Sequence, residues 1–455
     1  MDMPLSTITL STISSTSPSA ISTATSSTPP SLPYEKIEFE NGCRLLLIPM
    51  TGVASVATAV MVNVGSRFET PEINGISHFL EHMVFKGTEK YPTTEDVNFI
   101  ERLGGLQNAY TDIDVTNYHN KVLYTDWKSS LEINKELALY PRLEEQYVDK
   151  ERNVILEEMK RYEDEPAAKV GEAFHTMLYP HEALGMRIIG EEAPLRAATS
   201  QTLRAYHDAW YVPERMVVVM SGNIEKDKDQ MIASAKSWFG SLTKKSTGDM
   251  QRVNLTQTTP AVTFVTKPDA SQAHLNLGVR IFNRTNDDRF GWNVFNLLFG
   301  VSFTSRLFKE IREKKGLCYT IRSGADTWDD VGYWSIYAGV ATEKVKETVE
   351  GIMDELKKAV ELGVTDEEVA VAKKRLLTMI AFKSEDPEFM TEFYGRQELY
   401  HLPIMTVDGY MKIIESITAE QIHAMIKKYF VTNTLNLAVV WNREADDSLI
   451  SLLNC

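Results

Sequence analysis

His78-Phe79-Leu80-Glu81-His82 places two imidazoles and a carboxylate on one side of a single helical turn. Residues four apart lie above one another on a helix surface, so His78 and His82 can point at one atom. Two histidines at that spacing suit a tetrahedral Zn²⁺, with N–Zn distances of roughly 2.0–2.1 Å. Glu81 lies on the same face, close to such a metal but free to act as a base. The pattern therefore predicts a zinc site on a short, otherwise apolar helix.

A catalytic zinc site needs a third protein ligand and one open position. Residues 149–162, DKERNVILEEMKRY, have helical periodicity. Their apolar stripe is formed by Val154, Ile155, Met159 and Tyr162. Glu158 falls in this stripe without an evident cation on its own helix, whereas Glu157 has Arg161 at i+4. Because a carboxylate on a buried face is costly unless it is paired or bound to metal, we predict Glu158 as the third ligand. Glu151 shares its face and could orient a ligand from behind.

An internal repeat divides the chain into two similar halves. TSQTLRAYHDAWYV (199–212) aligns without gaps with TAEQIHAMIKKYFV (418–431), and each copy is followed by a β-rich segment. The spacing of 219 residues implies two related domains of about 200 residues each. The first half begins with strand patterns joined by a hairpin turn at Asn41-Gly42. Strands and helices in both halves predict the α+β class, with two homologous domains related by duplication.

Shifts in composition set the expected domain boundaries. Residues 1–33 are rich in Ser, Thr and Pro, which predicts a disordered tail. A zinc-binding catalytic domain is expected at 34–243 and a substrate-holding domain at 260–446. The polar stretch 244–259 would link them, and 447–455 would form a C-terminal tail. No H-x-x-E-H sequence occurs in the second half, so that domain is expected to be inactive.

Four motifs carry a resemblance to a known family. They are GISHFLEHMVFKGT (75–88), ERLGGLQNAYT (101–111), ERNVILEEMKRYEDEP (151–166) and SRLFKEIREKKGLCYTI (305–321). The chain resembles the pitrilysin/insulinase-type zinc metallopeptidases over nearly everything from Tyr34 to Trp441. The likeness is greatest to the half-length branch that contains the β-subunit of the mitochondrial processing peptidase and bacterial processing proteases. This resemblance implies two related α+β domains that form half of a clamshell.

The resemblance also implies roles for the residues of the metal motif. His78, His82 and Glu158 match the family's ligands for one zinc ion per chain. Glu81 matches the glutamate that activates water, and Glu151 matches the acid that supports the site. The order and spacing agree with the prediction made from periodicity.

Four further residues match positions that contact substrate in the family. Arg312 and Tyr319 match a pair that acts near the scissile bond and that lies, in full-length members, in the opposing half of the molecule. By analogy, a second subunit would supply this pair. Asn108 and Ala109 lie in a segment that resembles the substrate-aligning strand; an ordinary internal strand is the equal alternative.

The resemblance implies a zinc-dependent endopeptidase that cleaves peptides or unfolded segments inside a dimeric chamber. A homodimer is expected because the metal motif and the Arg312/Tyr319 pair occur in one chain; the alternative is a heterodimer with a related inactive subunit. A non-catalytic core subunit or a peptide-binding partner subunit is the alternative function. The segment Phe299-Gly300-Val301 departs from the consecutive glycines of many bacterial relatives. This difference concerns the handling or release of substrate and leaves the expected zinc chemistry unchanged.

Composition excludes several other classes of protein. A net charge of −15 argues against nucleic-acid binding, which usually leaves a basic footprint. Three cysteines without a CxxC pattern indicate a reducing compartment. No run of about 18 apolar residues occurs, so no membrane insertion is expected. No signal or transit segment is recognised either, and a cytoplasmic location is therefore expected.

Overall fold

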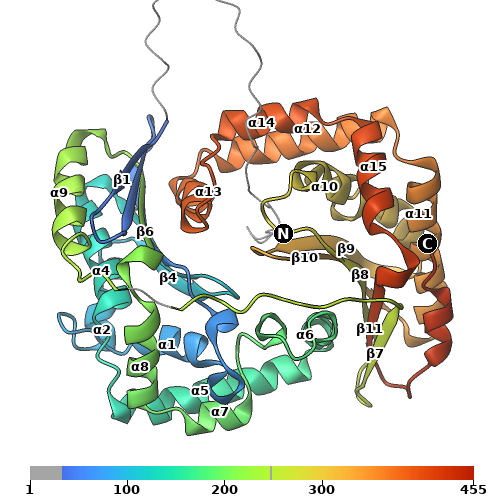
Figure 1. Ribbon diagram of the computed structural model, residues 1–455, viewed down its shortest axis with the longest axis horizontal. Coiled ribbons are helices and arrows are strands. Elements are labelled where there is room, and N and C mark those ends of the chain that lie inside the picture. Colours follow the sequence, from blue (N-terminus) through green and yellow to red (C-terminus); the bar gives the residue numbers. More distant parts are fainter. Residues whose placement is uncertain (1–32, 246–247) are drawn as a thin grey trace, which may run out of the picture.

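The computed structural model describes residues 33–245 and 248–455, so the predicted N-terminal tail lies outside it except for Pro33. Two sheets lie on opposite sides of the molecule, each with its own helices (Figure 1). The predicted hairpin is present: β1 (Glu35–Glu38) pairs antiparallel with β2 (Arg44–Pro49). At its turn Gly42 has a φ of 89°, a left-handed conformation that glycine adopts without strain.

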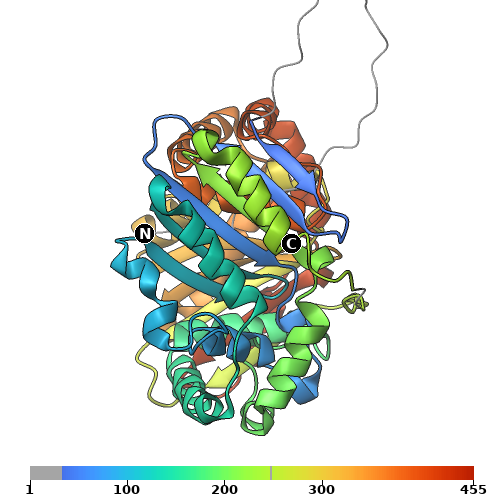
Figure 2. The same ribbon diagram turned by 90° about the vertical axis from the view of Figure 1, so that its left-hand side faces the viewer.

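The first sheet has the strand order β1-β2-β6-β3-β5-β4. Its remaining strands are β3 (Ser55–Val62), β4 (Leu106–Thr111), β5 (Thr116–Leu123) and β6 (Met216–Gly222). Strands β2 and β6 are parallel, and the other neighbours are antiparallel. Helices α4 (Trp127–Leu139) and α9 (Lys228–Trp238) lie across the outward face (Figure 2). Strand β4 is at the edge, so one side of its backbone has no strand partner in the described part of the chain.

The second sheet repeats this topology. Its strands are β7 (Ala261–Thr266), β8 (Ala273–Ile281), β9 (Cys318–Thr327), β10 (Gly332–Val340) and β11 (Leu435–Trp441). Their order, β7-β11-β8-β10-β9, equals β2-β6-β3-β5-β4 when each set is counted along the chain. Helices α8 (Ser200–Trp210) and α15 (Ala419–Tyr429) both begin at capping boxes, made by Thr199 and Thr418. The predicted duplication is confirmed.

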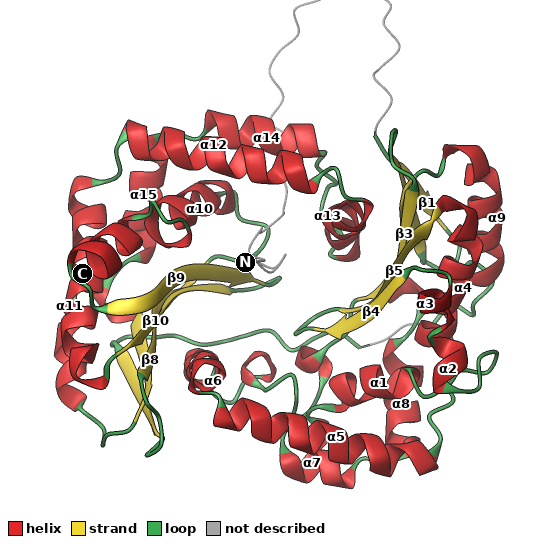
Figure 3. Ribbon diagram, turned by 180° about the vertical axis from the view of Figure 1, so that it is seen from behind, coloured by secondary structure: helices red, strands yellow, loops and turns green. Residues whose placement is uncertain are grey.

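Each half contributes one helix to the sheet of the other half. Helix α6 (Pro166–Leu178) packs on β7, β8 and β11, whereas α13 (Pro387–Leu399) packs on β2, β3 and β6 (Figures 1 and 3). A Cβ added at Gly395 would lie 2.7 Å from Sδ of Met61, so α13 rests directly on the first sheet. The two helices occupy corresponding positions in the two duplicated halves. Each half therefore covers the sheet of the other with the same helix, and the exchange of helices is reciprocal.

The other helices surround these two layers. In the first half they are α1 (Ile76–Val84), α2 (Thr94–Val97), α3 (Phe99–Arg102), α5 (Glu145–Asp164) and α7 (Glu192–Ala197). In the second half they are α10 (Asp288–Asn296), α11 (Val345–Leu362), α12 (Asp366–Lys383) and α14 (Val407–Ser416). Among the described residues, no helix is both long enough and apolar enough to cross a bilayer.

Helix α5 differs in one respect from its prediction. It extends beyond both ends of the predicted 149–162, and two members of the predicted apolar stripe are exposed: Val154 by 50% and Tyr162 by 37%. The buried apolar side chains are Val148, Ile155, Leu156 and Met159. The buried face of α5 therefore differs from the predicted stripe, and it is the face that packs against α1 and α6.

Candidate metal centre

Helix α1 is fixed at its beginning by glycine and by a buried carboxylate. Gly75, at the N-cap, has a φ of 96°, and a Cβ there would lie 2.8 Å from the Cα of Gly190. Glu69 accepts hydrogen bonds from the backbone N–H groups of Gly75 at 2.7 Å and Ser77 at 2.8 Å. These donors would otherwise be unpaired at the helix end. The first turn of α1, and with it His78, is thereby held in place.

His78 and His82 on α1 converge with Glu158 on α5. Oε2 of Glu158 lies 3.5 Å from Nε2 of His82 and 3.9 Å from Nε2 of His78. One ligand atom from each residue can be chosen so that all three lie within 4.8 Å of one another. Ligands about 2.0–2.1 Å from a tetrahedral Zn²⁺ are separated by about 3.3 Å, so only small movements would close this arrangement on an ion. The donor set fits zinc.

The protonation of the two imidazoles suits metal binding. Burial, and to a lesser degree the neighbouring His82, lowers the pKa of His78 to about 3, so its ring is neutral. Nδ1 of His82 lies 3.4 Å from Oε2 of Glu151, which leaves Nε2 directed at Glu158. Burial opposes ionisation of Glu151, but hydrogen bonds from His82 and Lys86 lower its pKa. A carboxylate behind a histidine is the usual support of a metal ligand.

Lys86 is a residue of this centre that the sequence analysis missed. Its Nζ lies 2.8 Å from Oε1 of Glu151, the oxygen that does not face His82. The sequence could have indicated Lys86, because it stands four residues after His82 and so on the same helical face, just beyond the end of α1.

The pairing of Glu158 was predicted wrongly. Arg161, on the same helix, places Nη2 3.4 Å from Oε1 of Glu158, while Glu157 pairs instead with Lys160 at 2.6 Å. The Arg161 side chain is 70% exposed, so this contact is largely screened by water. Because Oε1 of Glu158 is paired with Arg161, its Oε2 remains directed at His78 and His82.

Glu81 lies beside the edge strand β4. Burial raises the pKa of Glu81, and hydrogen bonding from Thr111, the last residue of β4, works against that rise. The Ala109 N–H donates to Oδ1 of Asn108 at 2.9 Å, so this N–H is directed away from β5. Asn108 is exposed and Ala109 is buried. Thr111 and Ala109 therefore share the free edge of the sheet, next to the predicted base.

Arg312 and Tyr319 lie together, but in the second half. The Arg312 guanidinium carbon is 5.2 Å from the centroid of the Tyr319 ring, and Tyr319 is 78% exposed. Tyr319 is near the start of β9, whereas Thr327, at its end, lines a cavity together with His78. Eight residues of strand span about 26 Å. The structure thus brings the pair together and keeps it away from the metal centre of the same chain.

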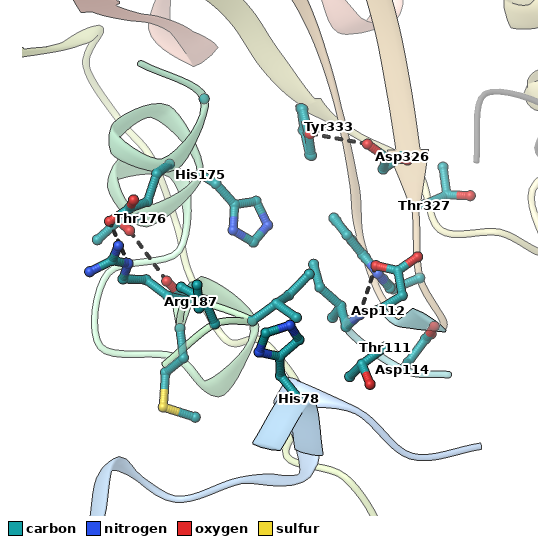
Figure 4. Close-up of a pocket in the computed structure, with 18 of the residues that line it drawn as sticks. His78, Thr111, Asp112, Asp114, His175, Thr176, Arg187, Asp326, Thr327 and Tyr333 are labelled. Carbon is teal, nitrogen blue, oxygen red and sulfur yellow. Dashed lines mark hydrogen bonds and ion pairs between the residues drawn. The ribbon is translucent and has the colours of Figure 1, made fainter. Parts of the chain in front are cut away.

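A cavity of about 570 Å³ adjoins His78 at the junction of the two halves. Figure 4 shows His175 of α6 directed into it, opposite Asp326 and Tyr333 of the second sheet. Burial lowers the pKa of His175 to about 4, and its Nε2 has no hydrogen-bond partner among the described residues. Burial and the nearby Asp112 raise the pKa of Asp326 to about 7. No local sequence motif marks these residues, because they come from distant segments.

Both halves of the chain match known proteins. Residues 45–192 match the model for insulinase (peptidase family M16), and residues 197–376 match the model for the peptidase M16 inactive domain. An uncharacterised zinc protease of Bacillus subtilis is 32% identical over 88% of this chain and 96% of its own length. An uncharacterised zinc protease of Mycobacterium leprae is 33% identical over 84% of this chain and 86% of its own length.

A solved structure supports the fold. The crystal structure of a protease from Helicobacter pylori superimposes with a TM-score of 0.83 at 21% identity, covering 90% of this chain and all of the other. The chain belongs to the insulinase family, peptidase family M16, as one of its half-length members. The predicted family and the predicted two-domain α+β architecture are both confirmed.

Proposed function

We propose that this chain is a zinc-dependent endopeptidase that cleaves peptides or unfolded polypeptide segments in a chamber formed by two subunits. One observation carries the proposal: His78, His82 and Glu158 converge on one point, while Glu81, on the same helix as the histidines, is hydrogen-bonded to Thr111 of the edge strand β4. The names of the related zinc proteases support the same chemistry.

The side chains around the centre have separate tasks in this proposal. Zinc, held by His78, His82 and Glu158, would lower the pKa of a water molecule and polarise the scissile carbonyl. Glu81, whose pKa is raised by burial, is suited to accept the water proton and pass it to the leaving amine. The free edge of β4 offers backbone donors and acceptors to a peptide bound as an added strand. The cavity beside His78 gives room for a substrate side chain.

The second subunit would complete the site. Tyr319 is exposed beside Arg312, yet about 26 Å of strand β9 separates it from Thr327, which lines the cavity of the same chain. A facing subunit could bring its own copy of the pair to the substrate, with Tyr319 stabilising the oxyanion. A homodimer satisfies this requirement with one gene product; a heterodimer with a related inactive subunit would satisfy it as well.

The competing function is that of a non-catalytic core or peptide-binding subunit. In its favour, residues 197–376 match a model described as the inactive domain of the family. That match lies outside the segment that carries His78, Glu81, His82 and Glu158. The zinc peptidase therefore remains the better-supported function.

The deciding experiment is hydrolysis of a quenched mixed-peptide library by the wild type, Glu81→Gln and Glu157→Gln, with zinc content measured on each. Glu157 is the matched control because it is an exposed glutamate adjacent to the ligand Glu158. We expect cleavage by the wild type and by Glu157→Gln, and zinc without cleavage in Glu81→Gln. A wild type that binds no zinc and cleaves nothing would favour the non-catalytic subunit.

A further inference from the structure

We infer that Glu392 and Arg396, on helix α13 of the second half, are positioning residues that hold the substrate-aligning strand β4 of the first half in place. The inference rests on the proposed peptidase function. It assigns the second half a task within its own subunit, in addition to the one that Arg312 and Tyr319 would perform across the dimer.

The contact is centred on the hydroxyl of Tyr110. This oxygen donates to Oε1 of Glu392 at 2.6 Å and accepts from Nη2 of Arg396 at 2.9 Å, while the two α13 side chains form an ion pair. Arg396 also lies 3.9 Å from Asp112, just beyond β4. Glu392 is only 6% exposed, and burial raises the pKa of Tyr110 well above its usual value. Desolvated charges that are fully paired in this way fix geometry, because losing one partner is costly.

Helix α13 follows β5 in register, which brings it to Tyr110. The contacts are Lys121 Nζ to Asp386 Oδ1 at 2.8 Å, His119 Nε2 to Glu388 Oε1 at 3.4 Å, and Asn117 Nδ2 to Glu392 Oε2 at 3.3 Å. Four residues of helix rise about 6.0 Å, and two residues of an antiparallel strand rise about 6.8 Å. His119 and Asn117, two strand residues apart, therefore meet Glu388 and Glu392, which are one helical turn apart, while Lys121 meets Asp386 at the N-cap of α13. The next turn of the helix carries Arg396, which reaches the edge strand.

Tyr110 and Thr111 connect this contact to the metal centre. Consecutive side chains of a strand point to opposite faces, so Tyr110 faces α13 while Thr111 is on the side of Glu81. Strand β4 has a neighbour on one side only, and the other side of its backbone is the proposed peptide-binding edge. Because an edge strand gains little restraint from the sheet, a side-chain anchor on its inner face sets where a bound peptide lies.

The equivalent place in the other half lacks the anchor. Helices α6 and α13 both begin with proline, at Pro166 and Pro387. Counting from these prolines, Gly171 and His175 stand where α13 has Glu392 and Arg396. Instead of an ion pair against the edge strand, α6 leaves the cavity lined by Gly171, His175 and Asp326. Among the described residues, an ion pair of the crossing helix holds the edge strand only in the half that contains the metal motif, which is the distribution expected of a functional device.

The test removes the hydroxyl alone, with Tyr110→Phe, and compares it with Tyr410→Phe. Tyr410 is a matched control because it is a buried tyrosine whose hydroxyl accepts from Asn293 at 2.8 Å, and its ring packs on Phe393 of α13. We expect Tyr110→Phe to raise KM for a long peptide about five- to tenfold with little change in kcat, and to affect a short peptide much less. Tyr410→Phe should leave both values near those of the wild type.

Substitutions of Glu392 and a measurement of hydrogen exchange, which does not depend on activity, complete the experiment. Glu392→Gln keeps an acceptor for Tyr110 and should raise KM less than Glu392→Ala. The double variant Tyr110→Phe/Glu392→Ala should raise KM by less than the product of the two single effects, because both single variants remove the hydrogen bond between Tyr110 and Glu392. Amide hydrogen exchange at 106–111 should become faster in Tyr110→Phe and not in Tyr410→Phe.

The exchange measurement separates this inference from the proposed function. If the wild type cleaves no peptide, faster exchange of β4 in Tyr110→Phe alone would still establish the anchor. If the wild type is active but Tyr110→Phe matches Tyr410→Phe in both KM and exchange, the inference is wrong while the peptidase stands.

Discussion

Oε2 of Glu151 lies 3.4 Å from Nδ1 of His82, on the side of the imidazole opposite the nitrogen that faces Glu158. Glu151 thereby offers an acceptor to a proton on Nδ1 of His82. In the tautomer with the proton on Nδ1, Nε2 has a free lone pair for a metal. The predicted support acid thus acts on one histidine.

Replacing Glu151 should weaken zinc binding without removing a ligand. We expect Glu151→Ala to lower the affinity for zinc about 10- to 100-fold, because His82 loses its orientation and Lys86 its partner. Competition with a chromophoric chelator measures this affinity. Glu157→Ala is the control and should bind zinc as the wild type does; equal affinity in both variants would remove the assigned role of Glu151.

Loss of a ligand should have a larger effect than loss of its support. Glu158→Ala leaves only two donors, and we expect its zinc content to fall well below one ion per chain after dialysis, with cleavage lost. Metal analysis after dialysis against a weak chelator gives the answer. Retention of full zinc by Glu158→Ala would mean that another residue is the third ligand.

Mixing two inactive variants tests whether sites are shared between subunits. One variant carries Glu81→Gln; the other carries Arg312→Ala and Tyr319→Phe. In a homodimer with shared sites, exchange of subunits creates one intact site in each mixed dimer, so the mixture should recover about a quarter of wild-type activity. No recovery after verified subunit exchange would place Arg312 and Tyr319 outside the site, or would indicate a different partner chain.

Stability should depend on pH through Asp326. Burial and Asp112 raise its pKa from 3.8 to about 7, so between these values the native chain keeps a proton that the unfolded chain releases. Its contribution to stability is therefore complete below about pH 4 and is lost as the pH rises through 7. Asp326→Asn should flatten this part of the profile and gain on the order of 1–3 kcal/mol at pH 8 relative to the wild type.

Urea unfolding midpoints at pH 5 and pH 8 measure the Asp326 effect. The amide oxygen of Asn can still accept the hydroxyl of Tyr333, which lies 3.0 Å from the carboxylate, so local geometry should be retained. Asp229→Asn, at an exposed position of α9, provides the control. A profile of Asp326→Asn parallel to that of Asp229→Asn would contradict the prediction.

The local part of the metal centre could be predicted from the sequence because helical geometry determines it. His78 and His82 are four residues apart, so the spacing alone makes them neighbours. Glu158 followed from periodicity and from the distal family motif, although the period misplaced Val154 and Tyr162 in the buried stripe. Hydrophobic periodicity predicts which side of a helix is buried. Which positions at the borders of that side are buried depends on the element against which the helix packs.

Contacts between distant segments could not be predicted in this way. Tyr110 and Glu392 are 282 residues apart, and no spacing rule relates them. The cavity has the same origin, because His175 and Asp326 meet only when α6 crosses to the second sheet. The repeat indicated two similar domains, but nothing in it indicated that they exchange helices.

The reciprocal exchange of α6 and α13 has a consequence for the history and handling of this molecule. Two identical copies that trade one element and close around a twofold axis form a domain-swapped dimer. Joining such copies end to end through the segment between α9 and β7 would give the topology of this chain. A cut in that segment should accordingly leave two polypeptides that stay interlocked and purify together, whereas either one alone would lack the cover of its sheet.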